Sequence, residues 1–261
     1  EKALAVGGAV LDESRYLEAA QRAAEFILQR MTRDDGRLLH AYRDGESHLD
    51  GYLDDYAYTI EAFIALFEST GDQRWVEIAV NLADTMVKHF EDVESGGYFY
   101  TADDGEALIA RNKDWHDGSL VSGNASATMG LLRLSTLCDR DDLRKSAERT
   151  LCSAAEVLEK QSAACAALLS ALDRFANDDQ QIVLAVPDQP TLEALRPRFF
   201  SRYRPHTAVS WVVGEPRQSV ISINQDRKPV DGQTTVYNCR GFVCDRPLVG
   251  DEALQWLAND G

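Results

Sequence analysis

Two stretches of this chain share one helical pattern: residues 15–31 read RYLEAAQRAAEFILQRM, and residues 74–90 read RWVEIAVNLADTMVKHF. They align without a gap at an offset of 59 residues (74 minus 15), and arginine, an aromatic residue, glutamate and alanines recur at matching positions. Self-similarity at a fixed period is typical of proteins built from repeated structural units. The pattern therefore predicts an architecture of stacked helix pairs.

The two helices of each unit differ in how their apolar residues are distributed. The first type is apolar on one face, whereas the second is apolar nearly all round, as in residues 53–70 and 123–138. A helix of the second type has to be packed on most sides, so the sequence predicts an outer and an inner layer. The helices predicted on this basis span residues 14–32, 53–70, 74–90, 123–138, 141–160 and 162–177, with residues 1–10 as the end of a further helix.

Between the two helices of a unit the chain makes an excursion, which follows residue 32 in the first unit and spans residues 91–122 in the second. The two excursions share an aligned stretch, residues 36–46 and 96–106, that ends in Asp-Gly-Glu in both. Asp-Gly is a hairpin turn signal, so both excursions are predicted to be hairpin-like. Stacked helical hairpins form an open solenoid or a closed ring, and the long period favours the ring. The predicted fold is mainly α: three hairpins of a partial (α/α)6 toroid over residues 1–177.

The character of the sequence changes at Asp178. Short runs rich in β-branched residues follow, separated by turn residues and by a helical pattern at residues 191–203. A small α/β domain is therefore predicted over residues 178–261, ending in a short helix that begins near residue 250. Its predicted strands are residues 181–186, 208–213 and 234–243.

Charge excludes several classes of partner. The 261 residues carry 27 Lys and Arg against 43 Asp and Glu, a formal net charge of −16. Such a surface repels phosphate backbones and anionic lipid, so neither nucleic acid nor a membrane is an expected partner. The sequence also contains no apolar run of spanning length.

Five cysteines form an odd set without CxxC spacing, which favours a reducing, cytoplasmic location. Cys239 and Cys244 could hold a metal or form a redox pair, but no further ligands stand at suitable spacing, so buried thiols are the favoured prediction. Neither phosphate-cradling glycine motifs nor HExxH and GxSxG occur. No cofactor and no metal site are predicted.

Five ordered motifs resemble the spermatogenesis-associated protein 20-like family, whose bacterial members are also described as DUF255 thioredoxin-domain proteins. The resemblance implies a thioredoxin-like domain upstream and an (α/α)6 toroid similar to the N-acylglucosamine 2-epimerase and six-hairpin glycosidase folds. It matches this chain to the C-terminal part of such proteins. The motifs are GYLDDYA at residues 51–57, GYF at 97–99, RNKDWHDG at 111–118, SGN at 122–124 and VYNCRGFVC at 236–244.

In a toroid, the loops that enter the inner helices open onto a central funnel. Candidate acid and base groups at that end are Asp54 and Asp55, at the start of the helix over residues 53–70, and His116 and Asp117 in the second excursion. Carboxylates and an imidazole can exchange protons with a sugar near neutral pH. The alternative for the aspartates is helix capping, and for His116 a surface hydrogen bond.

Five further residues are predicted to bind substrate at the same end. Tyrosine and tryptophan rings stack on sugar faces, and carboxylate and amide groups bind hydroxyls. For Tyr56, a place in the core is the favoured alternative. The candidates are Tyr52, Tyr56, Asp114, Trp115 and Asn124.

Three functions remain open on the sequence alone. The first is a carbohydrate-binding toroid with epimerase- or isomerase-like proton transfer on a small, sugar-like ligand. The second is a glycosidase-like hydrolase, and the third is a non-catalytic binding or regulatory module attached to a thioredoxin-like domain. An upstream half of the same protein, or a second copy, is the expected partner that completes the ring.

Overall fold

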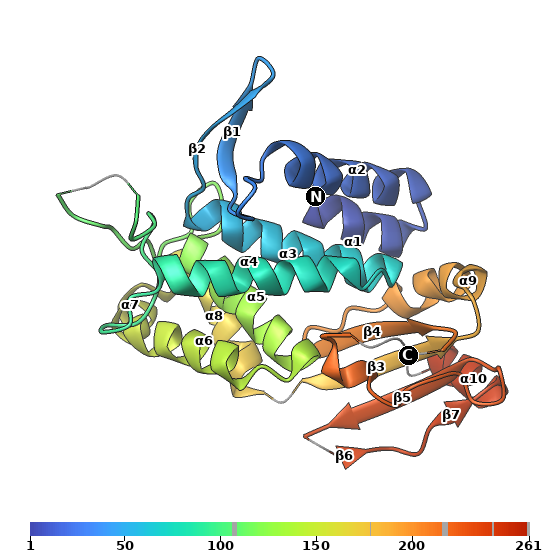
Figure 1. Cartoon of the computed structure of the whole chain (residues 1–261). Coiled ribbons are helices and arrows are strands. Elements are labelled where there is room, and N and C mark those ends of the chain that lie inside the picture. Colours follow the sequence, from blue (N-terminus) through green and yellow to red (C-terminus); the bar gives the residue numbers. More distant parts are fainter. Residues whose placement is uncertain (106–108, 178, 216–218, 242, 260–261) are drawn as a thin grey trace.

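The computed structural model describes residues 1–105, 109–177, 179–215, 219–241 and 243–259. Helices fill the first two thirds of the chain, and a small sheet with two helices follows (Figure 1). The helices are α1 (Lys2–Leu11), α2 (Ser14–Arg30), α3 (Leu53–Thr70), α4 (Arg74–Phe90), α5 (Gly123–Cys138), α6 (Asp141–Ser153), α7 (Ala155–Gln161), α8 (Ala166–Ala176), α9 (Gln189–Phe200) and α10 (Asp251–Asn259), with 3-10 turns η1 (Ser162–Ala164) and η2 (Ser222–Asn224).

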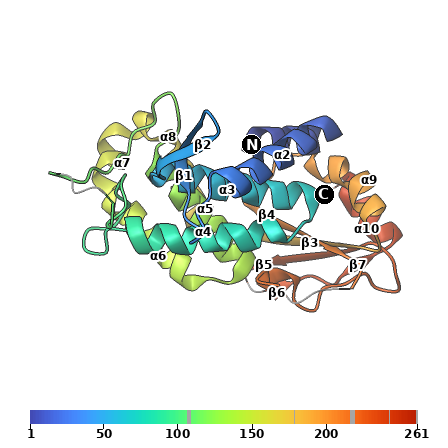
Figure 2. The same cartoon turned by 45° about the horizontal axis from the view of Figure 1, so that its top comes forward.

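The helices of the first part form two layers. Helices α1, α3, α5 and α8 pack one against the next as an inner row, while α2, α4 and α6 pack on α1, α3 and α5 from outside (Figures 1 and 2). The layered hairpins predicted from the sequence are therefore confirmed. Closure into a toroid stays a prediction. The single helix expected over residues 141–160 is wrong, because the chain breaks at Ala154 between α6 and α7.

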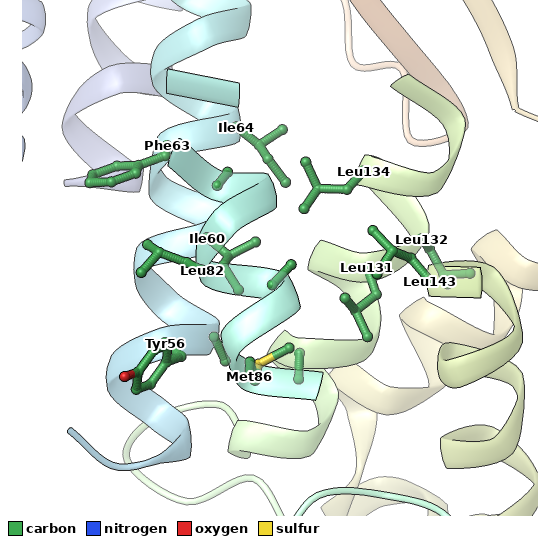
Figure 3. Packing of buried hydrophobic residues seen from close by; sticks show 14 of the residues in the cluster. Tyr56, Ile60, Phe63, Ile64, Leu82, Met86, Leu131, Leu132, Leu134 and Leu143 are labelled. Atoms are coloured by element: carbon green, nitrogen blue, oxygen red, sulfur yellow. The ribbon is translucent and has the colours of Figure 1, made fainter. Parts of the chain in front are cut away.

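Burial explains why α3 and α5 are inner helices. On α3, at most 1% of the surface is exposed at Ile60, Phe63 and Ile64. On α5, Leu131 and Leu134 are fully buried. Ile64 points toward Leu134, whereas Phe63 points to the other side of α3, and all of these side chains belong to one continuous core (Figure 3). Burying each such side chain contributes about 1.5–3 kcal/mol, so this helix pair anchors the first part of the fold.

The first excursion is the predicted hairpin. Strands β1 (Leu39–Arg43) and β2 (Glu46–Asp50) pair antiparallel around a turn in which Asp44 and Gly45 both take positive φ, 54° and 92°. This is the conformation that an Asp-Gly hairpin turn requires. The hairpin projects from the helical layers (Figure 1).

The second excursion is not a hairpin within its described residues, so that prediction is wrong; Glu106 lies outside them. Gly96 and Gly97 both have positive φ, 76° and 78°, and turn the chain back toward the helices. A single bridge joins Glu91 to Tyr98. The segment consequently lies against the start of α5, and within it the Tyr100 N–H donates to the Asn112 carbonyl oxygen at 2.8 Å.

Gly97 is needed for this path, and Gly97→Ala is expected to lower the free energy of unfolding by about 1–3 kcal/mol. A Cβ there would lie 2.5 Å from the Trp115 ring in addition to the strain of a positive φ. Urea unfolding measures the change. Gly36→Ala is the matched control, because Gly36 has φ of 84° but open space around its Cβ position. Equal losses in the two variants would refute the role of the Trp115 contact.

The last part of the chain is one sheet in the order β4-β3-β5-β6, with β7 on the other half of β5. β3 and β4 are parallel and joined through α9, whereas β5 is antiparallel to β3. Helices α9 and α10 share an apolar cluster with one face, and Ile223 of η2 packs on the other. The strands predicted over residues 181–186 and 208–213 are confirmed, whereas the one predicted over residues 234–243 is too long, because β5 ends at Arg240 and the antiparallel β6 begins at Val243. The strands are β3 (Gln180–Val186), β4 (Thr207–Val213), β5 (Thr235–Arg240), β6 (Val243–Cys244) and β7 (Leu248–Val249).

The two parts of the chain are joined by direct contacts. The Trp211 indole N–H donates to the Glu68 carbonyl oxygen at 2.8 Å, and η2 packs on α5. Asp178, where the sequence predicts the domain boundary, lies outside the described residues. Within the described part of the chain, no helix combines the length and apolar character needed to cross a membrane.

The prediction of buried free thiols at Cys239 and Cys244 is wrong. These residues face each other across β5 and β6 and form a disulfide. The spacing of the two cysteines does not report the reversal between the strands, which is what brings the side chains together. The cytoplasmic location inferred from the cysteine pattern stays a prediction.

Candidate functional site

Two adjoining cavities open along α3 and the segment leading into α5. The first, named the entrance cavity because it lies where the chain enters both helices, has a volume of about 190 Å³. The second, named the inner cavity because it continues along the inner helix α3, has a volume of about 430 Å³. Both include Tyr58, Leu120 and Val121 in their walls. Side chains in the entrance cavity include Asp54, Tyr100, Asp114 and His116, and those in the inner cavity include Lys2, Asp55, Glu61 and Ser126.

One stripe of α3 supplies the polar wall of both cavities. Asp54, Tyr58 and Glu61 stand at positions i, i+4 and i+7, so they lie on one face of the helix. Helix α5 faces this stripe closely. A Cβ at Gly123 would lie 2.2 Å from an Asp54 carboxylate oxygen, and the Ser126 hydroxyl donates to Glu61 at 2.7 Å. The absence of a side chain at Gly123 thus makes room for the Asp54 carboxylate.

Asp54 has the electrostatics of a proton-transfer group. Burial raises the pKa of its carboxyl group, and the negative charges of Asp55 and Asp114 raise it further, whereas His40 opposes them. Among the described residues the Asp54 carboxylate has no hydrogen-bond partner. A carboxyl group with a raised pKa on a cavity wall is a candidate for exchanging a proton with a ligand.

Asp55 has a different role from its neighbour. Its carboxylate accepts a hydrogen bond from the Tyr52 backbone N–H at 2.8 Å, which caps the first turn of α3. The same oxygen lies 2.9 Å from Nδ1 of His40 on the hairpin. These contacts engage the carboxylate in capping, and the catalytic role of Asp55 stays a prediction.

His116 and Asp114 lie together on the excursion that covers the entrance cavity. The Asp114 carboxylate accepts from the His116 backbone N–H at 3.1 Å. Nε2 of His116 lies 3.0 Å from the side-chain oxygen of Gln161. In the tautomer that donates from Nε2 to this oxygen, Nδ1 is a proton acceptor.

Asp117 and Asn124 hold the walls in place. The two carboxylate oxygens of Asp117 accept from the backbone N–H groups of Ser122, at 3.0 Å, and Ala167, at 2.8 Å. Asp117 thereby joins the excursion to the first turns of α5 and α8. Both oxygens bind backbone, and the catalytic role of Asp117 stays a prediction.

Asn124 is fully buried and acts as a backbone mimic. Its side-chain oxygen accepts from the Tyr98 N–H at 2.7 Å, and its amide nitrogen donates to the carbonyl oxygens of Tyr98, at 2.9 Å, and Asp114, at 3.1 Å. All of these groups belong to the excursion. Asn124 therefore positions Asp114; it also lines the entrance cavity, and its role as a substrate ligand stays a prediction.

Asn124→Asp is expected to lower the free energy of unfolding at neutral pH by about 3 kcal/mol or more, because a buried carboxylate would face two carbonyl oxygens. Urea unfolding at pH 7 measures this loss. The exposed residue Asn112 provides the matched control, since its hydrogen bond among the described residues is made by its backbone carbonyl oxygen, to the Tyr100 N–H, and not by its side chain. A change as small as that of Asn112→Asp would contradict the positioning role.

The aromatic candidates separate into the cavity and the core. Tyr52 stacks on Tyr100 with ring centres 4.9 Å apart, at the edge of the entrance cavity. Tyr56 is fully buried, and its hydroxyl accepts from the Leu38 N–H at 3.0 Å, which is the core position favoured from the sequence. Trp115 packs on the core and on Gly97, and its role as a stacking residue stays a prediction.

Tyr58 and Glu61 line the cavities but are not among the predicted site residues. Tyr58 donates its hydroxyl proton to the Val121 carbonyl oxygen, and burial raises the pKa of Tyr58 to about 12. Glu61 is buried between the Lys2 ammonium, at 2.6 Å, and the Ser126 hydroxyl. A glutamate inside a helix that is otherwise apolar all round was the signal in the sequence, because such a charge is buried only with partners.

One group of side chains in the described part of the chain could hold a metal ion. His89, Asp103 and Asp104 place their ligand atoms within 4.8 Å of one another. Arg37 donates two hydrogen bonds to Asp104, at 2.6 and 2.9 Å, and so competes with a cation there. The group lines neither cavity.

No family model matches the chain. Human spermatogenesis-associated protein 20 is 28% identical over 267 residues, which cover 97% of this chain and 34% of the human protein. The rat protein of that name is 27% identical with the same coverage. An uncharacterised protein of Caenorhabditis elegans is 26% identical over 95% of this chain and 35% of its own length.

Among solved structures, a Klebsiella pneumoniae protein described as "a possible member of GH105 family" is similar with a TM-score of 0.48 and 21% sequence identity. The match covers 59% of this chain and 42% of that protein. The chain spans about a third of the length of the curated relatives it matches. Over 97% of its length this chain is similar to spermatogenesis-associated protein 20, which confirms the family resemblance predicted from its motifs.

Proposed function

We propose that this chain contributes a carbohydrate-binding cavity in which Asp54 exchanges a proton with a sugar-like ligand. The observation that carries the proposal is the state of Asp54. It is a carboxyl group on a cavity wall, it lacks a hydrogen-bond partner among the described residues, and burial and neighbouring carboxylates raise its pKa. Asp55, one residue further on, is engaged as a cap.

The rest of the entrance cavity suits a polyhydroxylated ligand. Asp114 and His116 offer acceptors for hydroxyl groups, and the stacked pair of Tyr52 and Tyr100 offers an aromatic surface at the edge. Epimerase- or isomerase-like chemistry needs an acid and a base on one cavity. Asp54 in its protonated form would supply the acid, and Nδ1 of His116 would supply the base.

Hydrolysis is the second catalytic candidate, because Asp54 and Asp114 are electrostatically coupled carboxyl groups on the same cavity. A non-catalytic module is the third. It is favoured by Asp55, Asp117 and Asn124, whose polar groups all bind backbone. The activity of a longer protein, with a thioredoxin-like domain and a completed toroid, remains a proposal drawn from the family resemblance.

Ligand binding is tested first, by the thermal shift of the full chain against neutral sugars, N-acylated amino sugars, uronic acids and polyols. We expect one class to raise Tm in the wild type, and His116→Ala to reduce the shift. Asp44→Asn is the control, because Asp44 lies at the exposed hairpin tip. A panel in which no compound raises Tm would refute carbohydrate binding.

The reaction is tested with the sugar that binds, incubated in D₂O. Epimerase- or isomerase-like proton transfer places deuterium on a carbon atom of the sugar, whereas hydrolysis of a glycoside releases a new reducing end. Binding with neither product would establish the non-catalytic module and refute catalysis.

A further inference from the structure

We propose that the Cys239–Cys244 disulfide is a thiol–disulfide exchange site in which Cys244 is the sulfur open to attack and Arg227 stabilises the thiolate that forms. The site lies at the β5–β6 end of the sheet, away from both cavities. It does not depend on the proposed carbohydrate function.

The two sulfurs differ in access. Cys239 is buried on β5, with 8% of its surface exposed, whereas Cys244 on β6 is exposed. The two residues are direct partners in the antiparallel ladder. Exchange requires a thiolate to approach one sulfur of the disulfide, so an incoming thiol meets Cys244 first. An exposed sulfur next to a buried partner is the arrangement that such exchange needs.

Arg227 lies over both sulfurs. Its Nη2 is 3.3 Å from Sγ of Cys244 and 3.5 Å from Sγ of Cys239. The guanidinium also lies over the ring of Tyr237, 4.9 Å from its centre, and Tyr237 stands two residues before Cys239 on the same side of β5. The Tyr237 hydroxyl donates to the Lys228 carbonyl oxygen at 2.7 Å and fixes the segment that carries Arg227.

The Arg227 guanidinium has no carboxylate partner among the described residues, and it gains an anionic partner when the disulfide opens. A disulfide sulfur is a neutral, weak acceptor, whereas a thiolate bears a full negative charge beside the guanidinium. A nearby cation lowers the free energy of the thiolate and makes it a better leaving group. The other described cysteines lack this arrangement: burial raises the pKa of Cys138 to about 12, and Cys165 is also buried.

The exchange proceeds in two steps with a dithiol as reductant. One thiolate of the dithiol attacks Sγ of Cys244; a new S–S bond forms, the Cys239–Cys244 bond breaks, and Cys239 leaves as a thiolate beside Arg227. The second thiol of the reductant then loses its proton to solvent. The resulting thiolate attacks the reductant sulfur that is bonded to Cys244, and Cys244 is released as a thiolate. Two electrons pass from the dithiol to the protein, and the dithiol becomes a cyclic disulfide.

The first test measures the rate at which dithiothreitol reduces the disulfide in the folded chain, by alkylation and mass spectrometry. All variants carry Cys152→Ser, because Cys152 is an exposed free thiol. We expect Arg227→Gln to slow reduction about threefold to tenfold, and Arg227→Lys to keep most of the rate, because a cation remains. Arg246→Gln is the control, since Arg246 pairs with Glu252.

Equal rates in the wild type, Arg227→Gln and Arg227→Lys would overturn the role of Arg227. The melting temperature of each oxidised variant shows that the comparison is made on folded protein. Oxidised glutathione should join the thiols of Cys239 and Cys244 in a freshly purified chain. Failure to form this disulfide would overturn the site itself.

The second test asks which sulfur exchanges. With oxidised glutathione, Cys239→Ser should form a mixed disulfide on Cys244 rapidly, whereas Cys244→Ser should modify the buried Cys239 at least about tenfold more slowly. Similar rates for the two single-cysteine variants would overturn the assignment of Cys244 as the attacked sulfur.

Discussion

Replacing Asp54 with asparagine is expected to remove proton transfer to the ligand and at the same time to make the folded chain more stable at neutral pH. The amide has the same shape but cannot exchange a proton, and loss of a general acid or base lowers rates by about 10²–10⁴. Deuterium incorporation into the sugar measures this loss. Retention of the wild-type rate would show that Asp54 is not the proton-transfer group.

The stability gain follows from the raised pKa of Asp54 in the folded state. The native chain binds more protons at this site than the unfolded chain, so the stability contributed by Asp54 falls as the pH rises from the ordinary value of 3.8 through the raised pKa. The asparagine side chain of the variant does not titrate. The difference in Tm between Asp54→Asn and the wild type should therefore be small below that window and favour the variant above it.

Asp55→Asn is the matched control, because it alters the neighbouring carboxylate in the same way. Its carboxylate caps α3 and contacts His40, so its loss should lower the free energy of unfolding by about 0.5–2 kcal/mol. The two substitutions should thus shift Tm in opposite directions. A decrease in both would indicate that Asp54 is also a structural residue.

Arg133→Met is expected to have the largest effect on stability, about 3–5 kcal/mol, or a fall in Tm on the order of 10 °C. Arg133 on α5 donates to Glu68 on α3 at 2.6 Å, and both side chains are nearly buried, 12% and 13% exposed. Methionine fills the space of the arginine stem but leaves a charged carboxylate without its partner. Thermal and urea unfolding measure the change.

The double variant Glu68→Leu with Arg133→Met separates the charge from the packing. With both charges removed, most of the lost stability should return, because an apolar pair of similar volume replaces a buried ion pair with little loss. The nearby ion pair of Arg174 and Asp179, whose charged atoms lie 2.6 Å apart, is left intact by both substitutions. A double variant no more stable than Arg133→Met would show that shape, and not the unpaired Glu68, sets the loss.

The periodicity of apolar residues predicted the layers correctly because it reflects burial directly. Helices α3 and α5 are apolar on most sides and are the inner helices, and the Asp44-Gly45 turn correctly indicated the hairpin. The second excursion was misjudged although it also carries an Asp-Gly turn. Its course is set by the side chain of Asn124, far along the sequence, and no local pattern reports such a contact.

The candidate site could be placed at the starts of α3 and α5 but not resolved further from sequence. Asp54 and Asp55 are chemically identical neighbours, and only the folded chain shows that one caps the helix while the other faces the cavity. The core position of Tyr56 was favoured from the sequence, but its partner, the Leu38 amide, could not be named from the sequence. Glu61 was detectable in principle, as a charge within an apolar helix.

The tip of the projecting hairpin is a position at which the chain can tolerate insertions. The side chains of Arg43 and Asp44 are 85% and 89% exposed, and a Cβ at Gly45 would meet nothing within 4 Å. Each doubling in the length of a flexible loop costs only about 0.6 kcal/mol in entropy. Insertions at this tip, whether acquired in evolution or introduced as an epitope, would therefore leave the helices behind it undisturbed.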